Sequence, residues 1–294
     1  MYDLAMESPN STPSYDSDTA SEERPSSQPV NIKIQAKFRI ALPPPKSNQR
    51  LRLSPKLLLQ IQQLCPNHRP VPVLEIWQPP LYKSKLTKGF PQRPKLSTKD
   101  IYATLNEPYI TNKQLDGQEQ PQAQDIQSSI VHEKNIIAAI CQPSSNNNSS
   151  SPTSSIHFRD ARCIWQASVG TTGPEKSFCY KFAIKEENTT STEQPRMIMQ
   201  WEKRAHSANG DAASDDQFVL VAIDRKARRK SRIATMSRDG LEINVRKSSV
   251  LDHLRACWEL AEPVSPASAD LETWLYTLAL TLGISVASQE GWLV

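Results

Sequence analysis

The stretch from Trp274 to Ala287 is the longest apolar run in the chain, and it limits the fold more than any other feature. Leu275 and Leu278 fall on one helical face, but Leu280 points elsewhere, so the predicted helix is apolar nearly all round. Such a helix has no side that can face water. It must therefore be buried in a protein core or in lipid.

The polar residues of this helix form a single stripe of small hydroxyls: Thr277, Thr281, Ser285 and Ser288. Their hydroxyl groups can bond back to the preceding turn of their own helix, so the stripe tolerates burial where a charged face would not. Asp270 is a suitable N-cap, Glu272 stands in the first turn, and Gly291 is a suitable stop. These signals predict a helix that begins near residue 270 and ends near residue 291.

Length decides between a core and a membrane for this helix. A membrane span needs about 20 apolar residues, and this run is shorter and is interrupted by hydroxyl residues and by Gly283. The residues that follow it, Gln289 to Val294, supply no basic flank. We therefore expect a buried core helix, with tail anchoring at 274–287 as the alternative.

Composition divides the chain of 294 residues into four parts. Residues 1–30 are acidic and rich in Ser and Pro, and they hold too few apolar side chains to offset the entropy of ordering, so we expect a disordered tail. Residues 142–155 are rich in Asn and Ser and predict a linker or a surface loop. Strand and helix segments at 31–141 are expected to share a domain with the antiparallel β region and terminal helix at 156–294.

Charge and cysteine content narrow the function classes only slightly. The net charge of +4 is too small to imply a nucleic-acid partner by itself. The five cysteines are an odd number without a CxxC pair, and no N-terminal apolar signal segment precedes them. This pattern favours an intracellular protein, cytoplasmic or nuclear rather than secreted, with reduced thiols. The chain has only eight glycines and lacks a GxGxxG or GxxxxGK[ST] pattern. Both observations argue against a nucleotide-binding loop.

Residue patterns predict three elements near the start of the ordered region. Ile34 and its apolar neighbours alternate with polar residues, which predicts a strand over 31–40 with one buried face. Pro55 follows a serine N-cap, and the leucines after it share one helical face, which predicts a short amphipathic helix over 54–64. The segment 71–77 is strand-like but contains a proline, so we expect it at the edge of a sheet.

The segment from Pro79 to Pro94 combines basic and aromatic residues: Tyr82, Lys83, Lys85, Lys88, Phe90 and Arg93. A protein that binds a phosphate backbone or an anionic surface uses this mixture. A solvated proline-rich loop has the same composition. The sequence leaves both interpretations open.

Residues alternate between two faces, as in strands, over much of the chain after residue 156: 162–169, 178–184, 197–201, 218–224 and 241–245. The segment 218–224 is apolar on both faces, which predicts a strand covered on both sides. Gly173-Pro174 supplies a turn between the first two segments, so we expect a hairpin there and an antiparallel meander beyond it. Residues 251–260 predict a helix with Leu251, Leu254 and Trp258 facing inward.

Successive strands followed by one helix that is apolar nearly all round favour a particular architecture. Such a helix must be surrounded by other elements, and a curled antiparallel sheet can bury both the helix and its own inner face. The sequence therefore predicts a mainly β fold with a few helices, of the α+β class. We expect a curled antiparallel sheet or barrel packed around the hydrophobic C-terminal helix.

Residues 156–294 resemble the tubby C-terminal-like family, including its scramblase and LURP-one branches. The resemblance lies in the element order and in Phe218-Val219-Leu220-Val221-Ala222-Ile223-Asp224 leading to Ile233-Ala234-Thr235-Met236. It implies a β-barrel that encloses a hydrophobic C-terminal helix. Several tubby-like proteins bind phosphoinositides through basic residues, which implies the same possibility here without assigning it to Arg228 or Arg229. The chain also resembles uncharacterised proteins of filamentous fungi that end in a Trp-containing apolar helix, here Trp274 to Trp292.

Candidate catalytic and metal-binding residues are scattered. The five histidines form no HExxH, no His-x-His and no zinc spacing with the cysteines, and GxSxG is absent. We therefore expect no metal and no cofactor, and the sequence favours a non-enzymatic protein. The alternative is a site that the fold assembles, such as Cys163 or Cys179 beside His157, although cysteines on adjacent strands are also explained as small core residues.

Six basic residues crowd one predicted hairpin loop: Arg225, Lys226, Arg228, Arg229, Lys230 and Arg232. One hypothesis is a binding or adaptor protein that contacts anionic phospholipid, or a protein partner, through this loop. A second is a nuclear or nucleic-acid-associated regulatory protein that uses the run as a localisation signal or backbone clamp, although no zinc finger, helix-turn-helix or RNP pattern accompanies it. A third is a solvated hairpin tip that keeps a sheet edge from aggregating.

Overall fold

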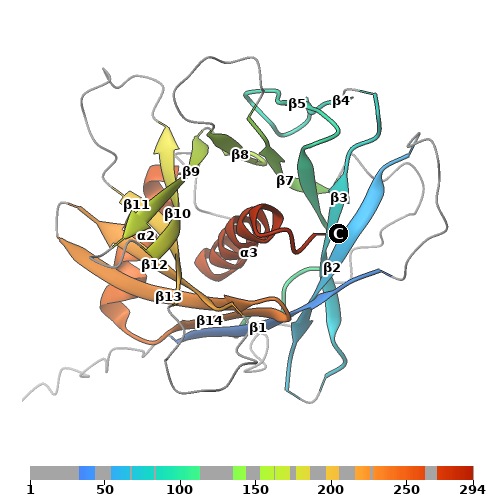
Figure 1. The fold of residues 1–294 in the computed structure, drawn as a ribbon. Coiled ribbons are helices and arrows are strands. Elements are labelled where there is room, and N and C mark those ends of the chain that lie inside the picture. Colours follow the sequence, from blue (N-terminus) through green and yellow to red (C-terminus); the bar gives the residue numbers. More distant parts are fainter. Residues whose placement is uncertain are drawn as a thin grey trace, which may run out of the picture. The chain divides into compact units, whose positions relative to one another are not determined.

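Strands surround the C-terminal helix in the computed structural model (Figure 1). The structure describes residues 33–43, 54–66, 68–82, 84–112, 135–143, 153–161, 163–172, 177–185, 197–204, 216–225, 228–261 and 270–293. The predicted tail at 1–30 lies outside these residues, and so does most of the predicted linker at 142–155. The end of that linker is instead the start of a strand, because Ser154 and Ser155 pair with their neighbours in the sheet.

Within the described residues, twelve antiparallel strands close into a barrel. They are β1 (Ile34–Ala41), β2 (Lys56–Leu64), β3 (Val71–Gln78), β6 (Ile101–Leu105), β7 (Ile136–Cys141), β8 (Ser154–Phe158), β9 (Ile164–Thr172), β10 (Ser177–Lys185), β11 (Met197–Lys203), β12 (Phe218–Asp224), β13 (Arg229–Ser237) and β14 (Gly240–Val245). The remaining elements are the small hairpin of β4 (Ser84–Lys85) and β5 (Lys95–Leu96), and the helices α2 (Ser248–Ala261) and α3 (Leu271–Gln289).

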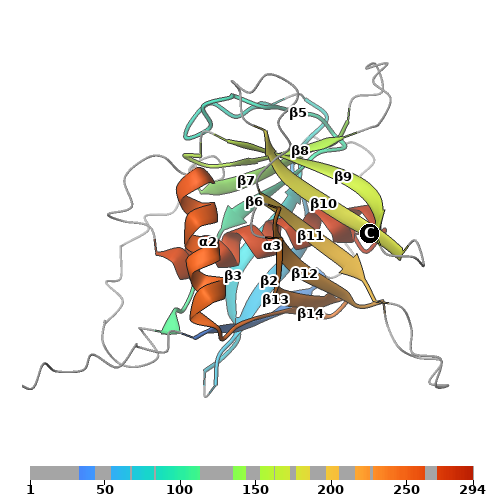
Figure 2. The same ribbon diagram turned by 90° about the vertical axis from the view of Figure 1, so that its left-hand side faces the viewer.

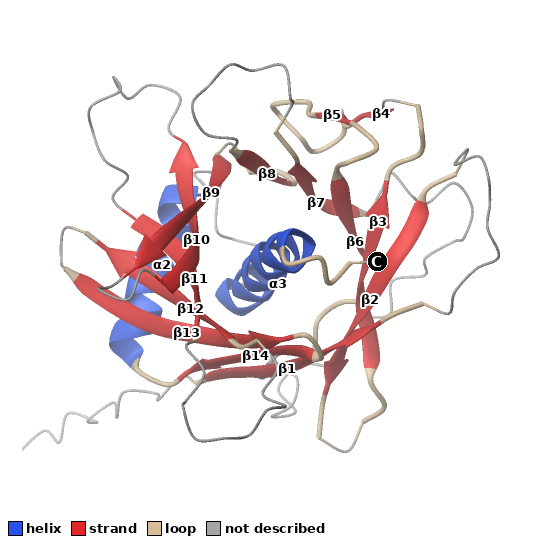
Figure 3. Cartoon of the chain, viewed as in Figure 1, coloured by secondary structure: helices blue, strands red, loops and turns tan. Residues whose placement is uncertain are grey.

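β1 closes the barrel by pairing with the last strand. Phe38 of β1 lies opposite Leu241 of β14 on one side and opposite Gln63 of β2 on the other. Figure 3 shows the strands as a ring around α3. A closed barrel leaves no strand edge unpaired. The prediction of an antiparallel barrel packed around the C-terminal helix is confirmed.

The helix predicted over 54–64 is wrong, because these residues form β2. The pairing of β2 with β3 shifts register between Leu57 and Leu59, and Leu58 and Leu59 are both buried as a result. This irregularity breaks the two-residue period and leaves apolar residues at a spacing that imitates a helix. Pairing with β1 and β3 satisfies the backbone groups that a helix would have satisfied internally.

The edge position predicted for the segment 71–77 is also wrong. This segment is β3, which pairs with β2 on one side and β6 on the other. Pro72 is accommodated where the register between β2 and β3 shifts, beside Ile61 and Gln62. A proline removes one ladder hydrogen bond, and an irregular position in the sheet is one of the few places that tolerates this loss.

α3 fills the lumen of the barrel. Its residues from Leu278 to Ala287 are all buried, and most of them belong to the same apolar core as the inner face of the strands. Gly283 lies close to the wall, because a Cβ atom there would lie 3.0 Å from the Met236 sulfur and 3.2 Å from Leu241 Cδ1. A side chain at this position would therefore require the Met236 and Leu241 side chains to shift.

Aromatic rings and a buried carboxylate fix the first half of α3. Tyr276 packs edge-on against Phe38 of β1 and Tyr109, with ring centroids 5.4 and 5.6 Å away. Its hydroxyl donates a hydrogen bond to Glu272, which also accepts a bond of 3.1 Å from the backbone N–H of Asn112. The segment after β6 is thereby attached to the start of α3.

α2 covers one end of the barrel, which we call the α2 end. Figure 2 shows α2 crossing the barrel where α3 begins. Leu251, Leu254 and Cys257 of α2 belong to the same apolar core as the barrel interior. The predicted helix at 251–260 is confirmed, but Cys257 is fully buried whereas Trp258, predicted to face inward, is only half-buried.

A second apolar layer lies outside the barrel. Leu86, Phe90 and Leu96, on and around β4 and β5, pack on Tyr102 and on neighbouring residues of β7. Phe90 is 2% exposed, so it is a packing residue and not a free aromatic surface for a ligand. Its burial leaves Tyr82 as the aromatic residue of 79–94 that is exposed.

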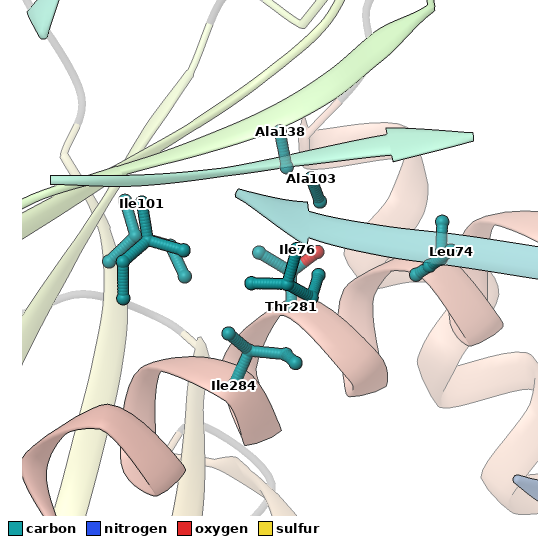
Figure 4. A pocket seen from close by; sticks show the side chains of 8 residues that line it. Leu74, Ile76, Ile101, Ala103, Ala138, Thr281 and Ile284 are labelled. Atoms are coloured by element: carbon teal, nitrogen blue, oxygen red, sulfur yellow. The ribbon is translucent and has the colours of Figure 1, made fainter. Parts of the chain in front are cut away.

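The hydroxyl stripe of α3 is only partly hydrogen-bonded within the described residues. Thr277 donates a bond of 3.3 Å to the Tyr109 hydroxyl. The hydroxyls of Thr281 and Ser285 are buried and have no hydrogen-bond partner, so the bonds predicted to the preceding turn are not formed there. Figure 4 shows Thr281 among apolar side chains of the wall, in a space too small for a water molecule. Each unpaired hydroxyl therefore destabilises the fold, by about 1–3 kcal/mol.

Replacing these two hydroxyls should stabilise the protein. We expect Thr281→Val and Ser285→Ala each to raise the free energy of unfolding by about 1 kcal/mol, because each removes a buried, unpaired polar group. Thr277→Val is the matched control and should lower it by a similar amount, since that hydroxyl has a partner. Urea unfolding followed by circular dichroism measures the three differences, and losses in all three variants would contradict the assignment.

Candidate functional site

The basic run lies at the α2 end of the barrel, between β12 and β13. Arg225 and Arg228 are exposed in the turn, and Lys226 lies outside the described residues. Arg229, Lys230 and Arg232 are not in a loop as predicted, because they belong to β13 and Arg229 pairs directly with Asp224 of β12. The β-ladder continues further toward the turn than the charge pattern indicated, so three of the cations have positions fixed by strand pairing.

Two cations of the run already have partners within the protein. Arg229 donates a hydrogen bond of 2.5 Å to the hydroxyl of Ser249, in the first turn of α2. The Lys230 ammonium lies 2.7 Å from both carboxylate oxygens of Glu202 on β11. Arg229 therefore helps to attach α2 to β13, and Lys230 helps to attach β13 to β11. Arg232 is exposed and alternates with the buried Ser231 and Ile233, so it points away from the barrel interior.

Strand register adds further cations to the run. Val245 at the end of β14 pairs with Ile34 at the start of β1, so the adjoining residues Arg246 and Lys33 lie side by side at the α2 end. Lys247 follows, and its carbonyl accepts the first backbone hydrogen bonds of α2. Because β14 pairs antiparallel with β13, the end of β14 and the start of β13 also lie at this same end.

We call this assembly the basic face. It comprises eight described residues: Lys33, Arg225, Arg228, Arg229, Lys230, Arg232, Arg246 and Lys247. Sequence reasoning missed Lys33, Arg246 and Lys247, which are far from the basic run in the chain. The available signal was that these residues directly flank two alternating segments, so any antiparallel pairing of those segments places them together.

Acidic groups near the basic face are engaged elsewhere. Asp224 faces His253 of α2 at 3.7 Å, and both side chains are largely buried. Glu242 on β14 pairs loosely with Lys37 at 3.8 Å, and Asp252 pairs with Arg255 within α2. The surface formed by the basic face therefore keeps an excess of positive charge.

The catalytic alternative of a cysteine beside His157 finds no support in the geometry. Cys179 lies on β10, which β9 separates from the strand that carries His157. Burial is the main cause that raises the pKa of the Cys179 thiol, so this cysteine is not an activated nucleophile. Cys163 packs against the apolar core, whereas His157 is on the outer face of β8, opposite the buried Ile156.

The structure instead places His157 near Ser155 and Cys141 on the outer face of the barrel. The Ser155 hydroxyl lies 3.2 Å from Nε2 of His157, and Cys141 is opposite Ser155 in the neighbouring strand. Burial, aided by the charge of Asp100, raises the pKa of the Cys141 thiol to about 12, so the thiol stays protonated. Nδ1 of His157 has no partner among the described residues, so the ring lacks the third group that orients a catalytic base from its second nitrogen.

Within the described ranges, no group of three or more His, Cys, Asp or Glu side chains could hold a metal ion. Among the helices that the structure describes, none has both the length and the apolar character needed to cross a bilayer.

Comparison with known proteins gives no assignment. No protein-family model, no curated protein and no solved structure matches this chain. The resemblances to the tubby C-terminal-like family and to fungal proteins therefore stay predictions. The geometry defines a β-barrel closed around an apolar helix, with a basic face at the end covered by α2.

The burial of His157 predicts a pH dependence of stability. Burial lowers the pKa of His157 from 6.5, so the unfolded chain binds a proton below about pH 6.5 while the folded protein stays neutral until lower pH. The free energy of unfolding should therefore fall as the pH drops below 6.5, by at most about 1.4 kcal/mol per pH unit. Urea unfolding at several pH values between about 5 and 7 measures this slope.

A matched pair of variants separates the contribution of His157 from that of other groups. His157→Gln should flatten this part of the pH dependence, whereas His68→Gln, at an exposed site, controls for the loss of a histidine. Equal slopes in the wild type and in His157→Gln would show that His157 is not the group responsible.

Proposed function

We propose that this protein is a non-enzymatic binding or adaptor protein that docks on anionic phospholipid through the basic face. The observation that carries the proposal is the convergence of cations from four chain segments on one end of the barrel: the start of β1, the β12–β13 turn, β13 and the end of β14. If the basic run served only as a solvated hairpin tip, cations in the turn alone would be sufficient.

The magnitude of the electrostatic attraction supports reversible membrane binding. Each Lys or Arg close to an anionic lipid surface contributes on the order of 1 kcal/mol. Arg228, Arg232, Arg246 and Lys247 are exposed and available for such contacts. Together they would supply several kcal/mol at low salt and less at physiological salt, where the Debye length is about 8 Å.

The surroundings of the basic face favour a lipid surface over single-stranded nucleic acid. Proteins that bind single strands stack the bases on exposed aromatic side chains. The most exposed aromatic residues among those described are Tyr82 and Phe178, at 71% and 63%, and neither belongs to the segments of the basic face. Anionic phospholipid is concentrated in the cytoplasmic leaflet, so the proposal also implies an intracellular location.

Neutralising the basic face should abolish binding to anionic vesicles. The test variant carries Arg228→Gln, Arg232→Gln, Arg246→Gln and Lys247→Gln. We expect its affinity for vesicles containing phosphatidylserine to fall at least about tenfold in co-sedimentation, because each cation contributes on the order of 1 kcal/mol. Wild-type binding should weaken between low and physiological salt and be absent with phosphatidylcholine alone.

The control variant removes the same charge from the outer layer of the barrel. It carries glutamine at four exposed positions: Lys85, Lys88, Lys95 and Lys99. Its binding should match the wild type. Equal loss in both variants would point to net charge alone, and salt-resistant binding to both lipid compositions would indicate apolar insertion. Binding to nucleic acid without binding to vesicles would favour the nuclear hypothesis over this one.

Removing the acidic partner of Lys230 should strengthen binding. Glu202 holds the Lys230 ammonium at 2.7 Å, so Glu202→Gln leaves that cation free to face the lipid. We expect the vesicle affinity to rise about three- to fivefold, which corresponds to somewhat less than 1 kcal/mol. Glu75→Gln on β3 makes the same change in net charge and should have no comparable effect. An equal rise in both variants would argue against a localised site.

A further inference from the structure

A second concentration of positive charge lies outside the barrel, on the segment from Pro79 to Lys99, which we call the outer hairpin. This segment holds six basic residues and no acidic one: Lys83, Lys85, Lys88, Arg93, Lys95 and Lys99. Five of the six are described by the structure and are exposed, whereas Lys83 lies outside the described residues. The lipid contact proposed for the basic face makes no use of this charge.

Strand pairing and burial hold these cations on one outward surface. β4 and β5 place Lys85 directly opposite Lys95. The neighbouring residues Leu86 and Leu96 are 6% and 1% exposed, and together with Phe90 they pack on residues of β6 and β7. Apolar side chains therefore attach the outer hairpin to the barrel, and the lysines that alternate with them face solvent.

The acidic residues beside the outer hairpin are already engaged. Asp100 is 3% exposed, and its carboxylate accepts hydrogen bonds from the backbone N–H groups of Ser97 and Gln142. The Asp160 carboxylate lies 3.6 Å from the Arg159 guanidinium. Lysines directly opposite each other repel, and within the described part of the chain none of the five cations of the outer hairpin forms an ion pair. An anion bound across the outer hairpin would relieve this repulsion.

An exposed aromatic ring accompanies the cations. Tyr82 stands two residues before β4, and its side chain is 71% exposed. Proteins that bind single-stranded nucleic acid without reading its sequence combine cations that contact the phosphates with aromatic rings on which the bases stack. We propose that the outer hairpin binds single-stranded nucleic acid, with Tyr82 stacking on a base and the five described cations contacting phosphates.

The outer hairpin and the basic face lie on opposite sides of the barrel. The outer hairpin packs on β6 and β7, and β7 is six places from β13 in the closed ring of twelve strands, which is halfway round. Figure 1 shows β4 and β5 across the ring from β13 and β14. The outer hairpin also joins the end of β3 to the start of β6, and in the antiparallel order both lie at the end of the barrel opposite α2. A flat bilayer on the basic face therefore leaves the outer hairpin in water, where it can bind a second partner. The nucleic-acid site stands whether or not the basic face binds lipid.

Fluorescence anisotropy with labelled oligonucleotides tests the proposal on the full-length protein. The probes are single-stranded oligouridine and oligothymidine of about 15 nucleotides, which is close to the largest site size of one small binding domain. Both should bind at low salt. Their affinity should fall about fiftyfold between about 50 and 200 mM salt, because about four phosphate contacts give a slope near −3 in log affinity against log salt. A duplex of the same length should bind more weakly, since its paired bases cannot stack on Tyr82.

The two quadruple variants exchange roles in this experiment. The outer-hairpin variant carries Lys85→Gln, Lys88→Gln, Lys95→Gln and Lys99→Gln. It should lose at least about tenfold in oligonucleotide affinity at low salt and keep its binding to vesicles. The basic-face variant should keep its oligonucleotide affinity and lose its binding to vesicles. A failure of lipid binding is therefore seen separately from a failure of nucleic-acid binding.

Single variants of Tyr82 separate stacking from charge. Tyr82→Ala should weaken oligonucleotide binding about five- to tenfold, whereas Tyr82→Phe keeps the ring and should bind as the wild type does. Phe178→Ala is the matched control, because Phe178 is 63% exposed on β10 and lies outside the outer hairpin. Unchanged affinity in Tyr82→Ala, equal losses in the two quadruple variants, or equal affinity for polyglutamate would overturn the proposal. Loss of vesicle binding but not of oligonucleotide binding in the outer-hairpin variant would overturn it in favour of a membrane contact.

Discussion

The burial of α3 inside the barrel is the interaction on which the rest of the structure depends. α3 has no face that can meet water, since its residues from Leu278 to Ala287 are all buried. A barrel of twelve strands is also too wide for its own side chains to fill, because about eight strands is the size at which they suffice. The helix and the barrel therefore complete each other, and Gly283 shows how closely they pack against β13 and β14.

Filling the lumen in this way leaves the outside and the ends of the barrel for contacts with other molecules. At the α2 end, β12, β13, β14 and β1 begin or finish side by side, and each brings cations to one surface. α2 lies across that end, bonded to Arg229 through Ser249 and facing Asp224 through His253. The basic face and the capping helix thus belong to one region of the fold, although their residues are dispersed along the chain.

Sequence patterns predicted the structure correctly where hydrophobic alternation alone decided it. They failed where a register shift or a long-range contact also acted. The alternation around Phe182 correctly predicted a strand, and the continuous apolar run around Leu220 correctly predicted a strand covered on both faces. At Leu58 a register shift disturbed that alternation, so a strand looked like a helix. Phe90 looked available to a ligand because nothing local indicates that it packs on a neighbouring part of the barrel. The pairing of Lys230 with Glu202 was equally invisible, since 28 residues separate them.

By itself the sequence determined that the chain is mainly β, because hydrophobic periodicity is a local property. It also determined that the last helix must be enclosed, because a helix that is apolar all round has no face that can meet water. It also located the basic run. Only the tertiary structure decided that β1 closes the barrel against β14 and that Lys33, Arg246 and Lys247 join that run. It also decided that the outer hairpin packs on β6 and β7 and places Lys85 opposite Lys95. Strand register and helix docking set these proximities through long-range contacts that no local pattern records.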